Sequence, residues 1–144
     1  MSIVLTAAQA TVVQRLSTRD WKVAVVRGYA GTGKTTLLRS LVHALGDDAL
    51  VLTPTGKAAL RVREATGLPA RTIHRWIYRP FEDEKTGEVH FAARPPTDLP
   101  AKSKVVLVDE ASMVGRQVHD DLLRYCGEFG ISIVFVGDGF QLPP

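Results

Sequence analysis

The sequence has a single cysteine, Cys126, and therefore no partner for an internal disulfide. It also lacks long apolar runs. A lone thiol excludes an internal disulfide framework and fits a reducing compartment. No apolar stretch approaches the roughly 20 residues that a membrane span needs. The first ten residues lack the charged start and apolar run of a secretory signal. We therefore expect a cytoplasmic protein with no membrane partner.

Internal repeats and low-complexity tracts are also missing, which excludes solenoid and fibrous architectures. The 144 residues match the size of one domain. A chain that is 45% hydrophobic and 23% charged has the balance of a globular protein with a real core.

Short apolar runs without polar alternation predict strands that are buried on both faces. Helical segments separate most of these runs, and that alternation predicts an α/β domain with a parallel sheet. The runs are Val23–Val26, Leu50–Leu52, Val105–Val108 and Ile131–Val136.

Capping residues mark where the helices begin and end. Thr6 predicts an N-cap, with Gln9 three residues on as in a capping box. The other helices should begin at caps or end at glycines. We expect them over Gly33–Leu45 before Gly46, over Thr55–Thr66 before Gly67, from Thr72 for a short stretch, and over Arg116–Cys126 with Gly127 closing it.

The segment Pro80–Ser103 contains four prolines and has no helical period. Residues 84–88 are typical of a turn, and residues 89–91 can return from it as a strand. This pattern predicts a small β-hairpin inserted in a loop.

A phosphate-binding loop is the strongest motif. The run from Gly28 to Thr35 fits G-x-x-x-x-G-K-[ST], follows an apolar strand and opens a helix. Glycines turn backbone N–H groups onto phosphates, and the helix offers them its positive end. Lys34 should reach the β- and γ-phosphates, and the Thr35 hydroxyl should bind Mg²⁺. The expected ATP contacts are Gly28, Ala30, Gly31, Thr32, Gly33, Lys34, Thr35 and Thr36.

Two carboxylates follow the third apolar run. Asp109 at the strand end is placed to hold Mg²⁺, and Glu110 beside it can orient or deprotonate the attacking water. After the fourth run, the amide of Gln141 could hydrogen-bond a γ-phosphate oxygen, although a simple turn explains that segment equally well.

A basic stretch between Pro54 and Arg79 contains six cations against Glu64 alone, and an acidic segment follows it. This asymmetry favours either a polyanion contact or a solvated helix face. Trp76 and Tyr78 among the arginines could stack on nucleic-acid bases. Trp76 could equally be a core aromatic, and His74 a core histidine.

Taken as a set, these residues resemble superfamily 1B DNA helicases, most closely the RecD/Dda branch and its N-terminal RecA-like motor domain. The resemblance covers Leu5 to Pro144. Its six blocks are residues 5–9, 28–36, 53–59, 72–74, 108–113 and 137–143.

The resemblance implies a P-loop NTPase fold in which the strands of motifs Ia, II, III and I lie side by side. It implies ATP and Mg²⁺ as cofactors, Gln9 on adenine, and Asp109 with Thr35 on the metal. It implies catalytic roles for Lys34, for Glu110 as base and for Gln141 as γ-phosphate sensor. It places DNA at Pro54, Thr55, Lys57, Thr72, His74 and Arg75.

The resemblance further implies 5′→3′ movement on single-stranded DNA, with the hairpin in residues 80–103 as the pin at a duplex junction. The family's second RecA-like domain, which supplies an arginine finger, has no counterpart in the sequence. We therefore expect the nucleotide-binding half of a motor, weak in hydrolysis and inactive in unwinding alone. A subunit of a RecBCD-like exonuclease and a DNA-independent P-loop ATPase stay open as alternatives, and so does a non-catalytic binding module.

Overall fold

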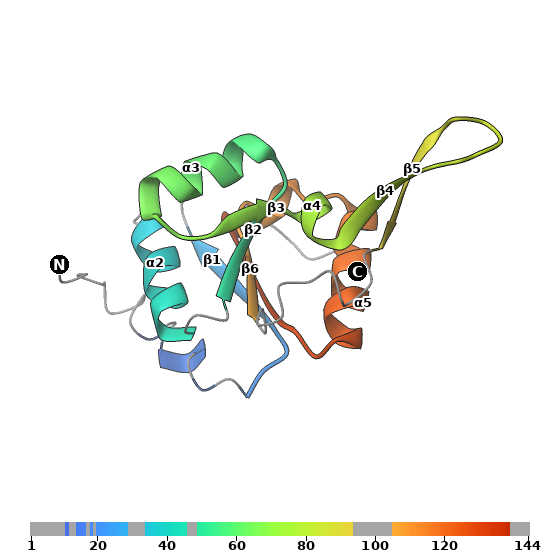
Figure 1. Ribbon diagram of the computed structural model, residues 1–144. Helices are drawn as coiled ribbons and strands as arrows, with labels where there is room; N and C mark the ends of the chain where they lie inside the picture. Colours follow the sequence, from blue (N-terminus) through green and yellow to red (C-terminus); the bar gives the residue numbers. More distant parts are fainter. Residues whose placement is uncertain are drawn as a thin grey trace.

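A five-stranded parallel sheet forms the centre of the fold. The computed structural model describes residues 11, 14–16, 18, 20–28, 34–45, 49–93 and 105–138. The strands are β1 (Val23–Gly28), β2 (Ala49–Thr53), β3 (Ala70–Thr72), β6 (Val105–Val108) and β7 (Ser132–Asp138), in the order β1-β7-β6-β2-β3 (Figure 1). This architecture confirms the predicted α/β P-loop fold, and β2-β6-β7-β1 is the expected order of the motif strands.

Helices cover both faces of the sheet (Figure 1). On one face lie α2 (Lys34–Leu45) and α3 (Gly56–Thr66), and on the other lie α4 (Ile73–Ile77) and α5 (Arg116–Glu128). The strands alternate between the two cores. Leu107 packs with the leucines of α2, whereas Val106 and Val108 pack with α4 and α5. Burial on both faces explains the apolar runs of β2, β6 and β7. The prediction of burial on both faces is wrong for the run in β1, where Val23 and Val25 are 49% and 38% exposed.

Most helix ends follow the predicted caps. The Thr55 hydroxyl accepts the Ala58 N–H at 3.1 Å, and Gly67 ends α3 in the left-handed region at φ 70°. The Thr72 hydroxyl accepts the Arg75 N–H at 3.1 Å and starts α4. The residues Thr6, Gln9 and Gly46 lie outside the described residues.

The predicted end of the last helix is wrong, because α5 runs through Gly127 to Glu128. The left-handed residue that terminates it is Gly130, at φ 66°. The Ile131 N–H then donates to the Cys126 carbonyl at 2.8 Å, which satisfies a carbonyl of the last turn.

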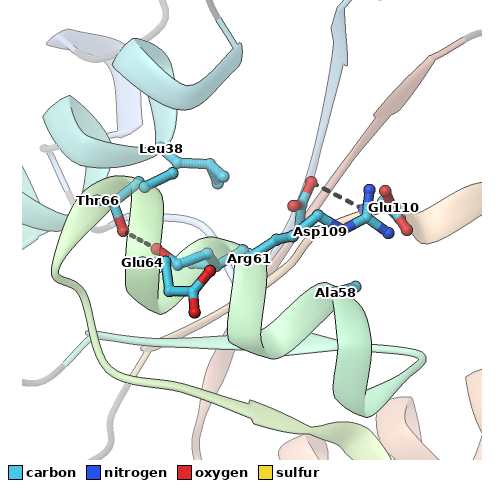
Figure 2. A pocket seen from close by; sticks show the side chains of 9 residues that line it. Leu38, Ala58, Arg61, Glu64, Thr66, Asp109 and Glu110 are labelled. Carbon is cyan, nitrogen blue, oxygen red and sulfur yellow. Dashed lines mark hydrogen bonds between the residues drawn. The ribbon is translucent and has the colours of Figure 1, made fainter.

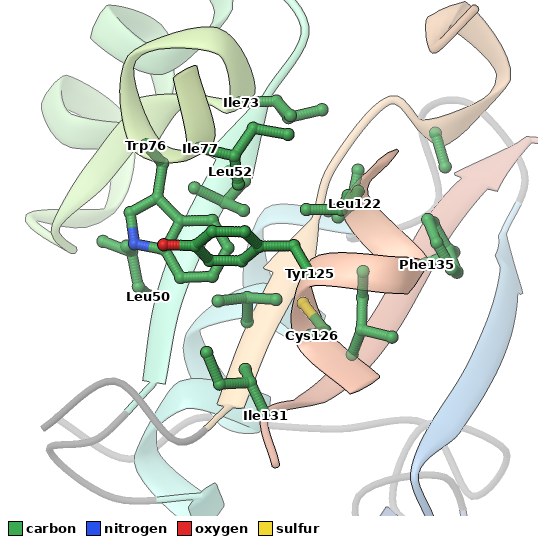
Figure 3. Close-up of a cluster of buried hydrophobic side chains, with 14 residues drawn as sticks. Leu50, Leu52, Ile73, Trp76, Ile77, Leu122, Tyr125, Cys126, Ile131 and Phe135 are labelled. Carbon is green, nitrogen blue, oxygen red and sulfur yellow. The ribbon is translucent and has the colours of Figure 1, made fainter. Parts of the chain in front are cut away.

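Trp76 belongs to the core, so a role as a stacking surface for bases is wrong. Its side chain is 1% exposed and meets the Tyr125 ring edge-on, at 5.4 Å between centroids. Figure 3 shows this cluster between α4, α5 and the sheet. The short helix buries Ile73, Trp76 and Ile77 and leaves His74 exposed, so His74 is not a core histidine.

The predicted hairpin is confirmed as β4 (Tyr78–Glu82) paired antiparallel with β5 (Val89–Ala93). It begins two residues before Pro80 and extends away from the α/β body (Figure 1). Residues 94–104 lie outside the described part of the chain. Among the described residues, no helix combines the length and apolar character that crossing a membrane requires.

Candidate functional site

Of the expected nucleotide residues that the structure describes, Gly28 and the Asp109–Glu110 pair lie where parallel strands end. The register pairs Gly28 with Asp138 and Leu52 with Val108, so the carboxyl ends of β1, β7, β6 and β2 share one edge of the sheet. In open α/β sheets this edge is where ligands bind.

The predicted phosphate loop has a strand before it and a helix after it, as the motif requires. Gly28 is the last residue of β1, and α2 begins at Lys34. Thr36, in the first turn of α2, is half-buried. For Lys34 and Thr35 the structure describes the backbone alone. The other predicted contacts lie outside the described residues: Gln9, Ala30, Gly31, Thr32, Gly33 and Gln141.

Asp109 is a buried carboxylate held by the end of the sheet. It is 7% exposed, and its backbone N–H donates to the Leu52 carbonyl at 2.8 Å. Its Oδ1 accepts the Glu110 N–H at 2.9 Å. Glu110 is half-buried and adopts a left-handed conformation, φ 53° and ψ 44°, the one non-glycine residue with positive φ in the described part of the chain. Such strained residues cluster at functional sites.

A pocket of about 500 Å³ lies beside these carboxylates. Its walls come from Leu38 of α2, one face of α3, Asp109 and Glu110. Figure 2 shows the Arg61 side chain reaching from α3 toward the two carboxylates. In the sequence analysis Arg61 was only one of the cations of the basic stretch, with no role in the site. Its helical spacing could have indicated which face of the helix it shares, because Arg61 lies three residues after Ala58 and residues three apart lie on the same face.

The donor chemistry at this edge fits Mg²⁺. Carboxylate and hydroxyl oxygens are the ligands that this hard cation takes. Among the described residues, no three His, Cys, Asp or Glu side chains gather into a metal site. A metal at Asp109 would therefore need further ligands, as Mg²⁺ typically finds in water and phosphate oxygens.

A second cavity, which we call the basic groove, lies on the other face of α3. Its volume is about 520 Å³, and it is lined by Gly56, Ala59, Arg63, Ala70, Arg71, Thr72 and Arg75. Arg71 and Arg75 are exposed, and Arg63 Nη1 donates to the Ala70 carbonyl at 2.7 Å. The structure thus brings three arginines together, which suits a polyanion.

Of the residues predicted to bind DNA, Thr72 and Arg75 line the basic groove and the others do not. Lys57 and His74 are exposed and Pro54 is half-buried. The Thr55 hydroxyl is occupied as the cap of α3. Arg63 also lines the groove, where it donates to the Ala70 carbonyl of β3, a strand that the sequence did not predict.

The sequence matches a known family over nearly its whole length. A family model described as an AAA domain (AAA_30) covers residues 4–144. The ATP-dependent RecD2 DNA helicase of Deinococcus radiodurans is 37% identical over 145 residues, which cover 97% of this chain and 18% of that protein. The ATP-dependent DNA helicase dda of Enterobacteria phage T4 is 33% identical over 124 residues, 83% of this chain and 27% of that protein.

Solved structures show the same relationship. Pif1 from a structure of two coordinating helicases at forked double-stranded DNA superposes with a TM-score of 0.71 at 29% identity, over 99% of this chain and 35% of that one. Pif1 from Bacteroides, in complex with ADP-AlF3 and single-stranded DNA, gives a TM-score of 0.67 at 27% identity, over 99% of this chain and 34% of that one. The chain therefore spans about a third of these structures, and less of the two curated relatives.

Proposed function

Because the chain belongs to the AAA_30 family and corresponds to the N-terminal RecA-like motor domain of superfamily 1B helicases, we propose that it binds ATP·Mg²⁺ and drives movement on single-stranded DNA. The observation that carries this proposal is the shared edge of the sheet. There β1 ends at Gly28, directly before the predicted phosphate loop, and β6 ends directly before the Asp109–Glu110 pair.

In this proposal the nucleotide's phosphates lie at the start of α2. Lys34 neutralises the β- and γ-phosphates, Asp109 with Thr35 holds the metal, and Gln9 contacts adenine. A bound Mg²⁺ would offset the charge that develops on the phosphates during transfer. Glu110 takes the proton of the attacking water. The Gln141 amide hydrogen-bonds a γ-phosphate oxygen and so distinguishes bound ATP from ADP.

The basic groove and the neighbouring start of α3 form the proposed DNA track. Arg63, Arg71 and Arg75 supply positive charge for successive phosphates. Lys57 and His74 lie exposed nearby in sequence and extend the cationic and aromatic surface. The structure of the Bacteroides Pif1 relative with single-stranded DNA supports this assignment.

The complete motor would need a second RecA-like domain with an arginine finger, and its movement would run 5′→3′. ATP would close the two domains and hydrolysis would release them, so that each cycle moves the strand. We propose that the hairpin β4-β5 is the pin that meets a duplex junction. Its base is tied to the motor core, because the Tyr78 hydroxyl donates to the Asp121 carboxylate of α5.

The test is a titration of a fluorescent, non-hydrolysable ATP analogue with Mg²⁺ into this chain, followed by labelled oligo-dT. We expect Lys34→Ala to abolish nucleotide binding, because the lysine's charge meets the phosphates. We expect Arg75→Ala to weaken oligo-dT binding and to lower its salt dependence, since one phosphate contact is lost. Arg124→Ala, which removes an exposed arginine of α5 that lines neither cavity, is the matched control.

Each outcome separates the alternatives. Nucleotide binding that survives Lys34→Ala would contradict the proposed site. Nucleotide binding without any oligo-dT binding would favour a DNA-independent P-loop ATPase. A RecBCD-like subunit would differ from a free-standing helicase in requiring partner subunits for unwinding.

A further inference from the structure

Helix α3 forms a wall shared by the nucleotide pocket and the basic groove. Its residues Ala58, Arg61 and Ala65 face the pocket that contains Asp109 and Glu110. Its residues Gly56, Ala59 and Arg63 face the groove. Both sets follow the spacing i, i+3, i+7, which places each set on one helix face. One short helix thus contacts both proposed ligand sites.

Hydrogen bonds and packing fix α3 to both sites. Arg63 Nη1 donates to the Ala70 carbonyl of β3 at 2.7 Å, on the groove side. Arg39 Nη2 of α2, the helix that follows the phosphate loop, donates to the Ala65 carbonyl of α3 at 2.8 Å. Ala58, Ala59 and Val62 are buried along the helix. A helix packed and bonded in this way shifts as a unit.

Arg61 is the cation that α3 directs at the paired carboxylates. The side chain leaves the helix from the pocket face and points toward Asp109 and Glu110 (Figure 2). A guanidinium offers a planar fork of N–H donors that matches carboxylate and phosphate oxygens. A displacement of α3 therefore changes where this cation lies relative to Glu110.

We propose that α3 couples DNA binding to nucleotide binding inside this single domain, and that Arg61 is the positioning residue through which it acts on the pocket that contains Asp109 and Glu110. The inference rests on the proposed function, because it takes the pocket as the nucleotide site and the groove as the DNA track. DNA phosphates at Arg63 and its neighbours hold α3 in one position, and the Arg61 charge is then held in one place beside Asp109, the proposed metal ligand, where it changes the affinity for ATP·Mg²⁺. The coupling needs no second motor domain.

The test is a linkage measurement on the 144-residue chain. The affinity for the fluorescent ATP analogue with Mg²⁺ is measured with and without saturating oligo-dT. Linkage requires that each ligand change the other's affinity by the same factor. We expect oligo-dT to change the affinity for the ATP analogue by a factor of about five or more in the unsubstituted chain, given the usual range of coupling between sites. In Arg61→Ala we expect this coupling factor to be about two or less. Arg61→Lys should restore part of the factor, because the charge returns without the fork.

Leu60→Ala is the matched control, since Leu60 lies beside Arg61 on α3, is 46% exposed and lines neither cavity. Leu60→Ala should keep the full coupling factor. Arg61→Gln repeats the test of Arg61 with a long, uncharged side chain in place of the methyl group of alanine. An unchanged factor in both Arg61 variants would overturn the role of Arg61. A factor of one in an unsubstituted chain that binds both ligands would overturn the coupling and leave the proposed function standing. A chain that binds neither ligand would overturn both.

Discussion

At the scale of single residues, the buried thiol of Cys126 makes the stability of the domain depend on alkaline pH. Burial raises the pKa of this thiol from 9.0 to about 12. The folded state therefore favours the protonated form, a contribution that is complete below pH 9.0 and lost as the pH rises toward 12. We expect the free energy of unfolding in urea to fall more steeply above pH 9 in the unsubstituted chain than in Cys126→Ala.

The comparison uses the slope of the free energy of unfolding against pH, because Cys126→Ala also lowers the absolute stability by leaving a cavity in the core. Tyr78, whose pKa is raised by burial and then by Asp121, is present in both proteins and contributes equally. The thiol should also react slowly with a disulfide reagent at pH 8 until urea unfolds the chain. Equal alkaline slopes in the two proteins would contradict this account of Cys126.

The residues that could be predicted from sequence are those whose roles depend on local geometry. Asp109 follows a buried strand, and Thr55 and Thr72 cap the helices that come directly after them. The roles of Arg61 and Trp76 depend instead on residues that are distant in sequence and pack against their helices. Helix α4 has five residues, too few for a hydrophobic period to reveal its buried face. Arg61 points toward Asp109 and Glu110, which are distant from it in sequence.

At the scale of elements, the hairpin β4-β5 is built to be stiff at both ends. At its tip, the Asp83 N–H donates to the Glu88 carbonyl and the Gly87 N–H to the Asp83 carbonyl, both at 2.8 Å. At its base, Tyr78 donates to Asp121, which also accepts from Gln117 at 3.0 Å. Isolated two-stranded hairpins are marginally stable, so this anchor matters.

We expect replacement of residues 83–89 by a Gly-Ser linker to abolish most duplex unwinding by a protein that joins this domain to its second motor domain. DNA-stimulated ATP hydrolysis should persist, because the hairpin lines neither cavity. Tyr78→Phe loosens the base alone and should lower unwinding less. The measurement pairs strand displacement with phosphate release. Unwinding that survives the linker would show that the hairpin does not separate strands.

The elements that could be predicted are those marked by an apolar run or by helix caps. The elements that could not be predicted have neither. The apolar runs of β2, β6 and β7 are buried on both faces, and α3 has a cap at each end. Strand β3 has three residues, of which Arg71 is exposed, so no apolar run marks it. It forms because β2 offers a parallel edge, a contact that no local pattern records. The glycine that ends α5 was misassigned because Gly127 and Gly130 are equally good terminators by sequence.

At the scale of the whole molecule, Arg61 is the arginine that lines the pocket beside Asp109 and Glu110, and its side chain points toward these carboxylates. It comes from a helix wall of the same domain. An arginine finger of the kind that stabilises phosphoryl transfer would have to reach the γ-phosphate from elsewhere, which in our proposal is the second RecA-like domain. Loss of such an arginine costs roughly 10³ to 10⁵ in rate.

We therefore expect the 144-residue chain to bind the ATP analogue yet to hydrolyse ATP slowly, with kcat rising by about 10³ to 10⁵ when the second domain is present. Steady-state phosphate release in both proteins, with oligo-dT, measures this ratio. Glu110→Gln should abolish hydrolysis in both while it preserves nucleotide binding, because the amide cannot accept the water's proton. If the chain alone turned over as fast as the two-domain protein, the transition-state charge would have to be met inside this domain. Arg61, as the arginine directed at that pocket, would then be the residue to test for that role.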